Sequence, residues 1–351
     1  MSIPNHAQNA QDRYFMMLAI EQAKQGLYTT RPNPAVGCVI VQAEMIVGQG
    51  FHPKAGEPHA EVFALKDAGA RAIGATAYVT LEPCSHTGRT PPCALGLIKA
   101  GVKRVVIAGL DPNPQVAGRG VRLLEQAGID VTVGVLTEQA EALNRGFLKA
   151  MRTQMPYVRL KIATSLDGRT AMASGESKWI TSTAAREDVQ KLRALSGAII
   201  TGSETVITDN PQLNVRSTQL GMPAKQVPAP KVVILDRRQR LEHSQYSDYQ
   251  LCRRPDTLYW REDNLTALLK KLVSEHQCYD VLVEAGANVA GSFLSQQLVD
   301  ELIVYQAPCL LGAEARPMVS FNPLSLSEQL RFEVGSHEQL GPDLKLTLYP
   351  L

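Results

Sequence analysis

The sequence predicts a protein of two α/β domains. Its 351 residues exceed what one ordinary hydrophobic core holds, and a composition of 44% hydrophobic and 20% charged residues is typical of a folded protein. Two successive stretches each alternate apolar runs of strand length with segments of helical periodicity, which favours sheets covered by helices. A helical pattern over 137–151, followed by Pro156, separates the two stretches. We therefore assign residues 1–150 to one domain and 151–351 to the other.

The first stretch is typical of a three-layer α/β domain. Its first helical pattern carries Phe15 and Leu18 on one face, and Gly26 stands where a glycine commonly ends a helix. The strands that follow are short, apolar and separated by turn residues. The pattern predicts helices over 12–25, 58–69, 92–100 and 120–126, and strands over 35–41, 45–49, 75–81, 104–108 and 130–133.

The second stretch repeats this alternation. It predicts strands over 158–163, 198–201, 232–235, 281–283 and 302–305, with helices over 184–195, 265–275 and 289–296. Residues 217–230 contain three prolines and indicate a loop, whereas 237–263 are polar and mixed and indicate surface without a defined element.

Charge and hydropathy exclude several classes of function. The 36 basic and 34 acidic side chains leave a net charge of only +2, so no overall field attracts nucleic acid or an anionic membrane. The first twenty residues lack the pattern of a signal peptide, and no stretch reaches the ~18 apolar residues that a spanning helix needs. We expect a cytoplasmic protein with neither a nucleic-acid nor a membrane partner.

One group of residues combines metal ligands with an acid. His59 and Glu61 open a predicted helix, Cys84 follows a predicted strand, and Cys93 opens the next helix. His59, Cys84 and Cys93 offer three ligands that suit zinc, and a three-ligand site leaves a fourth position for water, as a catalytic site requires. Glu61 would then transfer the proton of a water that zinc activates near neutral pH. Chance clustering of core cysteines is the alternative, but this order resembles that of zinc-dependent base deaminases.

Polar residues next to these ligands suit substrate binding. Eight residues separate Cys84 from Cys93, where base deaminases usually have two, and this segment carries His86 and Arg89. Both side chains suit binding of a phosphate or ribose, and the alternative is that both belong to a solvated loop. We do not expect His86 to bind zinc. Asn33 lies between two prolines, and its amide can pair with a pyrimidine edge or simply form a turn.

Three segments carry a resemblance to a known family. Residues 31–37, 59–61 and 81–93 resemble the deaminase half of the bifunctional riboflavin-biosynthesis deaminase/reductases. The resemblance implies a cytidine-deaminase-like fold, zinc bound by His59, Cys84 and Cys93, and proton transfer by Glu61.

The second half resembles the reductase half of the same family. No Gly-x-Gly-x-x-Gly follows a strand there, so a Rossmann site finds no support. Over 279–292 the pattern predicts a strand that turns through small residues into a helix. The small residues suit either the binding of an anion at the start of the helix or close packing of the helix against the strand. Segments 161–169, 175–181 and 201–216 carry the resemblance. It implies a dihydrofolate-reductase-like fold that binds NADPH, and a homo-oligomer formed through this domain.

The resemblance also assigns residues by position. It implies cofactor contacts at Ala163, Trp179, Thr205, Asp209, Arg237, Gly286, Ala287, Asn288, Val289, Ala290, Gly291 and Ser292. It implies substrate contacts at Lys161, Ser177, Arg193, Leu213, Arg216 and Glu284. Arginines such as Arg193 and Arg216 can hold a 5′-phosphate. Lys161 and Asp209 are candidates for the proton donor, or for a salt bridge at the rim of a pocket.

The resulting hypothesis is a bifunctional enzyme. The first domain would deaminate 2,5-diamino-6-(5-phosphoribosylamino)pyrimidin-4-one, and the second would use NADPH to reduce the ribosyl chain of the resulting uracil. A nucleic-acid base deaminase with an appended binding domain is the rival, which the near-neutral charge disfavours. A binding protein with structural zinc is a further alternative, although structural zinc usually has four protein ligands.

Overall fold

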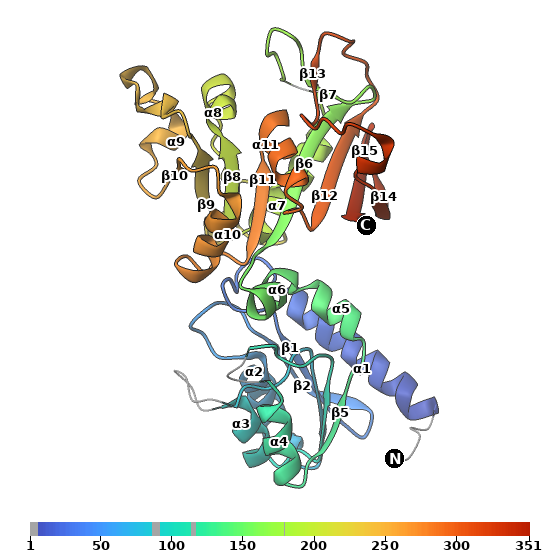
Figure 1. Ribbon diagram of the computed structural model, residues 1–351. Helices are drawn as coiled ribbons and strands as arrows, with labels where there is room; N and C mark the ends of the chain where they lie inside the picture. The colour runs from blue at the N-terminus through green and yellow to red at the C-terminus, as the bar shows by residue number, and fades with distance from the viewer. Residues whose placement is uncertain (1–5, 86–91, 114–116, 179) are drawn as a thin grey trace. The chain divides into compact units, whose positions relative to one another are not determined.

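A computed structural model describes residues 6–85, 92–113, 117–178 and 180–351, with side chains from residue 9 onward. The chain divides into two compact units, Met1–Thr153 and Gln154–Leu351 (Figure 1). The sequence analysis places the boundary after residue 150, and the contacts divide the chain after Thr153. Across the described ranges, no helix has both the length and the apolar character needed to cross a bilayer.

The first unit is built on a mixed five-stranded sheet. Its described strands follow the order β2 (Met45–Phe51), β1 (Gly37–Gln42), β3 (Thr76–Val79), β4 (Arg104–Ile107) and β5 (Asp130–Val133). Strand β1 is antiparallel to both neighbours, whereas β3, β4 and β5 are parallel. The helices are α1 (His6–Lys24), α2 (Ala60–Ala68), η1 (Gly69–Ala72), α3 (Cys93–Lys99), α4 (Arg119–Gln126), α5 (Thr137–Ala142) and α6 (Arg145–Thr153).

Helices cover both faces of this sheet. On one face, α2, α3 and α4 bury a cluster that includes Ala64, Leu97 and Leu124. On the other, α1 and α5 pack Phe15 and Ala140 against the sheet. The expected three-layer arrangement is confirmed.

Two glycines of β2 allow α2 to lie very close to the sheet. A Cβ at Gly48 would stand 2.2 Å from the carbonyl oxygen of Ala64, and one at Gly50 would stand 2.7 Å from that of Ala60. Any side chain at either position would push the helix away. Because α2 begins directly after His59, this close approach determines where His59 and Glu61 lie.

The prediction of a single helix over 137–151 is wrong. The structure has α5 and α6, separated at Leu143 and Asn144. The Asn144 amide pairs with the backbone of Ala35, accepting from its N–H at 2.7 Å and donating to its carbonyl at 2.9 Å. The break therefore serves to anchor the segment that carries Asn33.

The second unit is built on an eight-stranded sheet. Its described strands follow the order β10 (Leu258–Trp260), β9 (Lys231–Leu235), β8 (Ala198–Gly202), β11 (Asp280–Glu284), β6 (Tyr157–Ser165), β12 (Glu301–Ala307), β15 (Asp343–Pro350) and β14 (Phe332–Leu340). The first six strands run parallel to one another. Strand β15 is antiparallel to β12, and β14 is antiparallel to β15. A separate short pair joins β7 (Arg169–Ala171) to β13 (Arg316–Pro317).

Helices also cover both faces of the larger sheet. Helices α10 (Leu265–Ser274) and α11 (Ala287–Ser295) pack on one face through Leu268 and Phe293. Helices α7 (Thr183–Leu195) and α8 (Ser203–Asp209) pack on the other through Val189 and Val206.

Several elements of this unit had no counterpart in the sequence pattern. The sequence missed α8, β7, β10, β13, β14 and β15. Strand β14 is almost wholly exposed, so it lacks the apolar alternation that reveals a half-buried strand. Residues 217–230 form the expected loop apart from η2 (Ala224–Gln226), and 237–263 contain η3 (Arg240–Glu242), η4 (Ser244–Tyr246), α9 (Gln250–Arg253) and β10.

We predict that Gly48→Ala destabilises the first unit, because the new methyl group overlaps the backbone of α2. Such overpacking costs about 1–3 kcal/mol. Gly96→Ala is the matched control: it lies inside α3, and its Cβ would meet only the Leu65 side chain at 3.8 Å. Calorimetry should show a lower melting temperature for Gly48→Ala and an equal or higher one for Gly96→Ala. Equal melting temperatures for Gly48→Ala and the wild type would contradict the close-approach argument.

Candidate functional site

Three ligand side chains meet in the first unit. His59 directly precedes α2, Cys93 begins α3, and Cys84 follows β3. The His59 Nδ1 atom lies 3.6 Å from the Cys84 sulfur and 3.3 Å from the Cys93 sulfur, and the three ligand atoms all lie within 4.8 Å of one another. Residues from three separate elements therefore form one cluster, as the spacing predicts.

The surroundings of this cluster favour a thiolate. The side chain of Cys93 and then the imidazole of His59 donate toward Cys84, and against the opposing effect of burial they lower the pKa of its thiol to about 4. The backbone N–H of Cys93 also donates to the Cys84 sulfur, at 3.2 Å. The site thus stabilises negative charge on sulfur before any cation is considered.

Glu61 lies buried beside the cluster. Burial raises the pKa of its carboxyl group to about 6. Its Oε2 atom is buried, and no hydrogen-bond partner for it is found in the described part of the chain. A buried, unsatisfied carboxylate oxygen is costly, so this atom is available for a water molecule or a substrate. One imidazole and two thiols are the donor set that fits catalytic zinc, and the acid beside them is suited to proton transfer.

Asn33 is oriented by a histidine that the sequence analysis did not single out. His52 is 2% exposed, and burial lowers its pKa, so the ring is neutral. Its Nδ1 lies 3.0 Å from the carbonyl oxygen of Pro58 and must donate there, which leaves Nε2 as an acceptor. The Asn33 Nδ2 atom lies 3.0 Å from that Nε2. Asn33 therefore directs its amide nitrogen to His52 and keeps its oxygen for another donor.

Glu82 is a second residue that the sequence analysis missed. Its buried carboxylate accepts from the backbone N–H groups of Gly118 and Gly120 at 2.9 Å, and from those of Asp111 and Val121 at 3.3 Å. These donors include the start of α4, where negative charge is favoured. Glu82 therefore ties the chain around α4 to the strand end that carries Cys84.

The second unit contains a large open cavity of about 1170 Å³. Many expected contact residues line it: Lys161, Ala163, Ser177, Arg193, Thr205, Asp209, Leu213, Arg216, Arg237, Glu284, Gly286, Ala287, Asn288 and Val289. The volume exceeds that of a usual single-ligand pocket and suits a dinucleotide together with a substrate. At Gly286 an added Cβ would meet nothing within 4 Å, so the backbone before α11 faces open space.

A buried ion pair, Arg193 with Glu284, lines this cavity. Arg193 binds Glu284 through two hydrogen bonds of 2.6 and 2.9 Å and donates a third to the carbonyl of Asn214. Burial opposes the charge on Glu284, but Arg193 outweighs it and holds the pKa of Glu284 below its ordinary value. With its donors bound to protein groups, Arg193 positions Glu284, which leaves Arg216 the better placed arginine for a phosphate.

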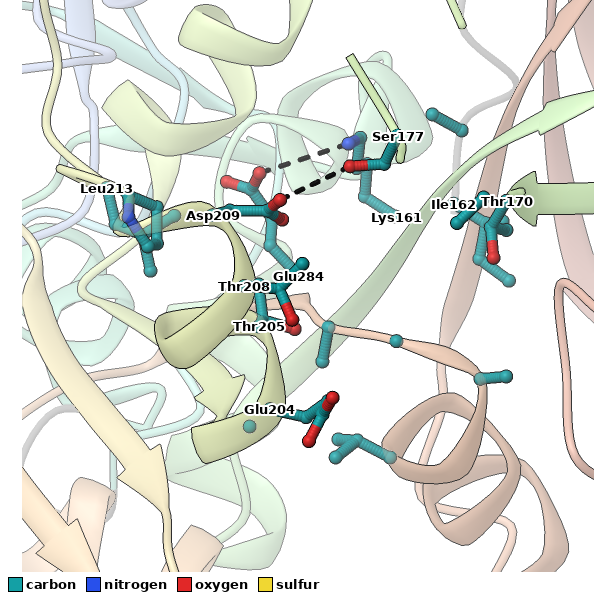
Figure 2. Close-up of a pocket in the computed structure, with 18 of the residues that line it drawn as sticks. Lys161, Ile162, Thr170, Ser177, Glu204, Thr205, Thr208, Asp209, Leu213 and Glu284 are labelled. Carbon is teal, nitrogen blue, oxygen red and sulfur yellow. Dashed lines mark hydrogen bonds and ion pairs between the residues drawn. The ribbon is translucent and has the colours of Figure 1, made fainter. Parts of the chain in front are cut away.

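Figure 2 shows Lys161 pointing toward Glu284 and Ser177 pointing toward Asp209. The Lys161 nitrogen lies 3.9 Å from Glu284, and the Ser177 hydroxyl donates to Asp209 at 3.2 Å. Burial lowers the pKa of Lys161, while Glu284 works against that effect. A lysine with a lowered pKa gives up its proton more readily than an exposed one.

Some expected contact residues lie elsewhere. Ala290, Gly291 and Ser292 are not among the cavity-lining residues. Ala290 is fully buried, Gly291 packs so closely against Ser320 that a Cβ would stand 1.9 Å from its carbonyl oxygen, and the Ser292 hydroxyl donates to Asn288 in its own helix. His86, Arg89 and Trp179 lie outside the described residues.

Comparisons with family models match both units. Residues 9–109 match the cytidine and deoxycytidylate deaminase zinc-binding region, and residues 156–346 match the RibD C-terminal domain. The first unit therefore has the expected cytidine-deaminase-like fold, and the second is consistent with the expected dihydrofolate-reductase-like fold.

Curated relatives and solved structures agree over nearly the whole chain. The riboflavin biosynthesis protein RibD of Haemophilus influenzae is 49% identical over 97% of this chain and 98% of its own. The RibD protein of Escherichia coli is 49% identical over 96% of this chain and 99% of its own. The structure of Acinetobacter baumannii RibD matches with a TM-score of 0.91 and 53% identity, covering 98% of this chain and 99% of that one.

A more distant structure extends the agreement. A diaminohydroxyphosphoribosylaminopyrimidine deaminase/5-amino-6-(5-phosphoribosylamino)uracil reductase from Thermotoga maritima matches with a TM-score of 0.88 and 33% identity, over 98% of this chain and 99% of that one. Similarity at this level, over both units and both family models, identifies the family. The chain belongs to the RibD family, the bifunctional deaminase/reductases of riboflavin biosynthesis.

Proposed function

We propose that residues 1–150 deaminate 2,5-diamino-6-(5-phosphoribosylamino)pyrimidin-4-one with zinc. Residues 151–351 then reduce 5-amino-6-(5-phosphoribosylamino)uracil to the ribitylamino product with NADPH. The observation that carries the proposal is the cluster of His59, Cys84 and Cys93 beside the buried Oε2 atom of Glu61, which has no hydrogen-bond partner among the described residues. The name of the similar Thermotoga maritima protein includes both substrates, which supports this assignment.

In the deaminase step, the residues of the first unit hold the base and move the proton. His59, Cys84 and Cys93 would hold zinc, which would supply the Lewis acidity that makes water nucleophilic at neutral pH. Glu61 takes the proton of the attacking water on its free oxygen and delivers it to the leaving amino group, so that ammonia departs. Asn33 offers its amide oxygen, oriented by His52, to an N–H group of the pyrimidine.

In the reductase step, the second unit aligns an opened ribose with the cofactor. The residues that line the cavity would hold NADPH, which would supply a hydride for the C1 atom of the sugar chain. Lys161 supplies the accompanying proton, because it is buried, has a lowered pKa and lies beside Glu284. Asp209 instead accepts from Ser177 and helps to shape the cavity wall. Arg216 binds the substrate phosphate.

The setting of the enzyme follows from the same chemistry. All six cysteines are free, and a reducing compartment such as the cytoplasm keeps Cys84 and Cys93 available as ligands. We further propose a homo-oligomer formed through the reductase unit, which light scattering would measure. A nucleic-acid base deaminase with an appended binding domain is disfavoured, since the second unit offers a cavity of small-molecule size.

We predict about one zinc ion per chain, held by one imidazole and two thiolates, with nitrogen near 2.0 Å and sulfur near 2.3 Å. X-ray absorption at the zinc edge measures both the ligand types and the distances. Cys84→Ser should lose most of the metal, whereas Cys252→Ser, which changes a free cysteine of the other unit, should retain it. A spectrum with four sulfur ligands would contradict the proposal.

We predict that Glu61→Gln retains zinc but deaminates at least ~100-fold more slowly, because the amide cannot shuttle a proton. Ammonia release measures the loss, and reduction of pre-deaminated substrate should continue. Glu125→Gln, at an exposed carboxylate on α4, is the control and should deaminate normally. Normal ammonia release from Glu61→Gln would remove Glu61 from the mechanism.

We predict that Arg216→Ala weakens reduction and leaves deamination nearly intact. Arg216 lines the cavity. Within the described part of the chain, the one hydrogen bond found for its Nη1 atom is donated to the side chain of Asn214, two residues away. Loss of a charge-assisted phosphate contact costs about 2 kcal/mol, or roughly thirtyfold in kcat/KM. Ammonia release and NADPH oxidation should be measured separately. Equal losses in both would mean that the two activities are not divided between the units.

A further inference from the structure

The segment that carries Asn33 reaches the sheet with little backbone bonding of its own. Strand β1 begins only at Gly37, and Pro34 has no N–H group to donate. Ala35 is 3% exposed, and within the described part of the chain no backbone group is found to bond with its N–H or its carbonyl. A buried backbone without partners is costly, so the position of this segment depends on a side chain from elsewhere.

The side chain of Asn144 supplies both missing bonds. Its amide oxygen accepts from the Ala35 N–H at 2.7 Å, and its amide nitrogen donates to the Ala35 carbonyl at 2.9 Å. The backbone of Asn144 is held in turn by the two helices beside it, because its N–H donates to Glu141 and its carbonyl accepts from Leu148, each at 2.9 Å. Asn144 is 7% exposed. Its amide therefore has one orientation and acts as a strand partner for Ala35.

Ala35 is close enough to Asn33 to control where its side chain lies. The single residue between them is Pro34, whose ring fixes its own φ and restricts the backbone of Asn33. The Asn33 amide nitrogen lies 3.0 Å from Nε2 of His52, and a movement of about 1 Å would take such a pair beyond hydrogen-bond distance. Loss of the bonds at Ala35 would therefore release the orientation of the Asn33 amide.

We propose that Asn144 is a positioning residue for recognition of the base. It fixes the backbone at Ala35, and through it the amide oxygen that Asn33 offers to an N–H group of the pyrimidine. The inference rests on the proposed deaminase function, in which Asn33 binds the base. Asn144 is buried, and both polar atoms of its amide are bound to Ala35, so it acts through Asn33 and makes no contact with the substrate.

The alternative is that Asn144 only stabilises the turn between α5 and α6. The two roles predict different kinetics. A hydrogen bond from Asn33 to the base is present in the ground state and in the transition state alike, so its loss raises KM and leaves kcat unchanged. General loosening of the unit would instead disturb the metal ligands as well, and would lower the zinc content and kcat.

The first test measures ammonia release from the diaminopyrimidine phosphate by the full-length zinc enzyme. For Asn144→Ala the KM should rise about tenfold, while kcat stays within about twofold and the zinc content is unchanged. Asn144→Leu fills the volume of the asparagine without its polar atoms and should give the same result. Tyr78→Phe is the matched control, because it removes another buried hydrogen bond of this unit, from the Tyr78 hydroxyl to Asp12 at 3.0 Å. It should keep the KM of the wild type.

The second test asks whether Asn144 acts through Asn33. Asn33→Ala and Asn144→Ala are combined in a double-mutant cycle, and the KM of the double variant should equal that of Asn33→Ala within about twofold. Calorimetry in a Glu61→Gln background measures the same cycle without turnover. The affinity for the diaminopyrimidine phosphate should fall about tenfold in each single variant and no further in the double variant.

The outcomes separate this inference from the deaminase function. If the wild type releases ammonia and Asn144→Ala keeps its KM, the inference is wrong and the function stands. Effects that multiply in the double variant, or a loss of zinc or of kcat in Asn144→Ala, also overturn it, because Asn144 would then have a structural role. Failure of both Asn144 variants to fold has the same meaning. A wild type that releases no ammonia overturns the function and the inference together.

Discussion

The carboxyl ends of the parallel strands in each sheet are the constraint on which both sites depend. In the first unit, β3 ends just before Glu82 and Cys84, and β4 ends before the segment that Glu82 binds. In the second unit, the parallel strands β6, β11, β8 and β9 end at Ser165, Glu284, Gly202 and Leu235. Strand ends leave backbone groups unpaired and turn the chain toward helices, so polar side chains gather there. The folds differ, but this geometry is common to both.

Buried charge is balanced in a different way in each unit. Glu82 has no salt bridge among the described residues, and four backbone N–H groups stabilise its carboxylate instead. Glu284 is stabilised by the side chain of Arg193, with Lys161 nearby. Backbone donors hold a loop in one position, whereas a side-chain ion pair leaves room for a ligand beside it. This difference suits a compact metal centre in one unit and a wide cavity in the other.

Close backbone approach is the second requirement of the deaminase unit. Gly48 and Gly50 bring α2 onto β2, and Asn144 binds the backbone at Ala35. These contacts bring both His59 and Asn33 next to His52, whose ring lies edge-on to His59 with centroids 5.3 Å apart and whose Nε2 lies 3.0 Å from the Asn33 amide nitrogen. The proposed metal ligands, proton carrier and base-binding amide therefore depend on a few small or amide side chains elsewhere in the sequence.

The sequence by itself determined the division into two α/β domains and the metal-ligand cluster. Both are encoded locally: apolar runs reveal buried strands, and His59, Cys84 and Cys93 lie at strand and helix ends that short-range patterns identify. Only the tertiary structure decided the roles of Glu82 and His52, the pairing of Arg193 with Glu284, and the break at Asn144. The orientation of α11, which buries Ala290 and Gly291, was likewise decided there. Each of these depends on a partner distant in the chain, and the hydrogen bond or packing contact that fixes it exists only after the sheet has assembled.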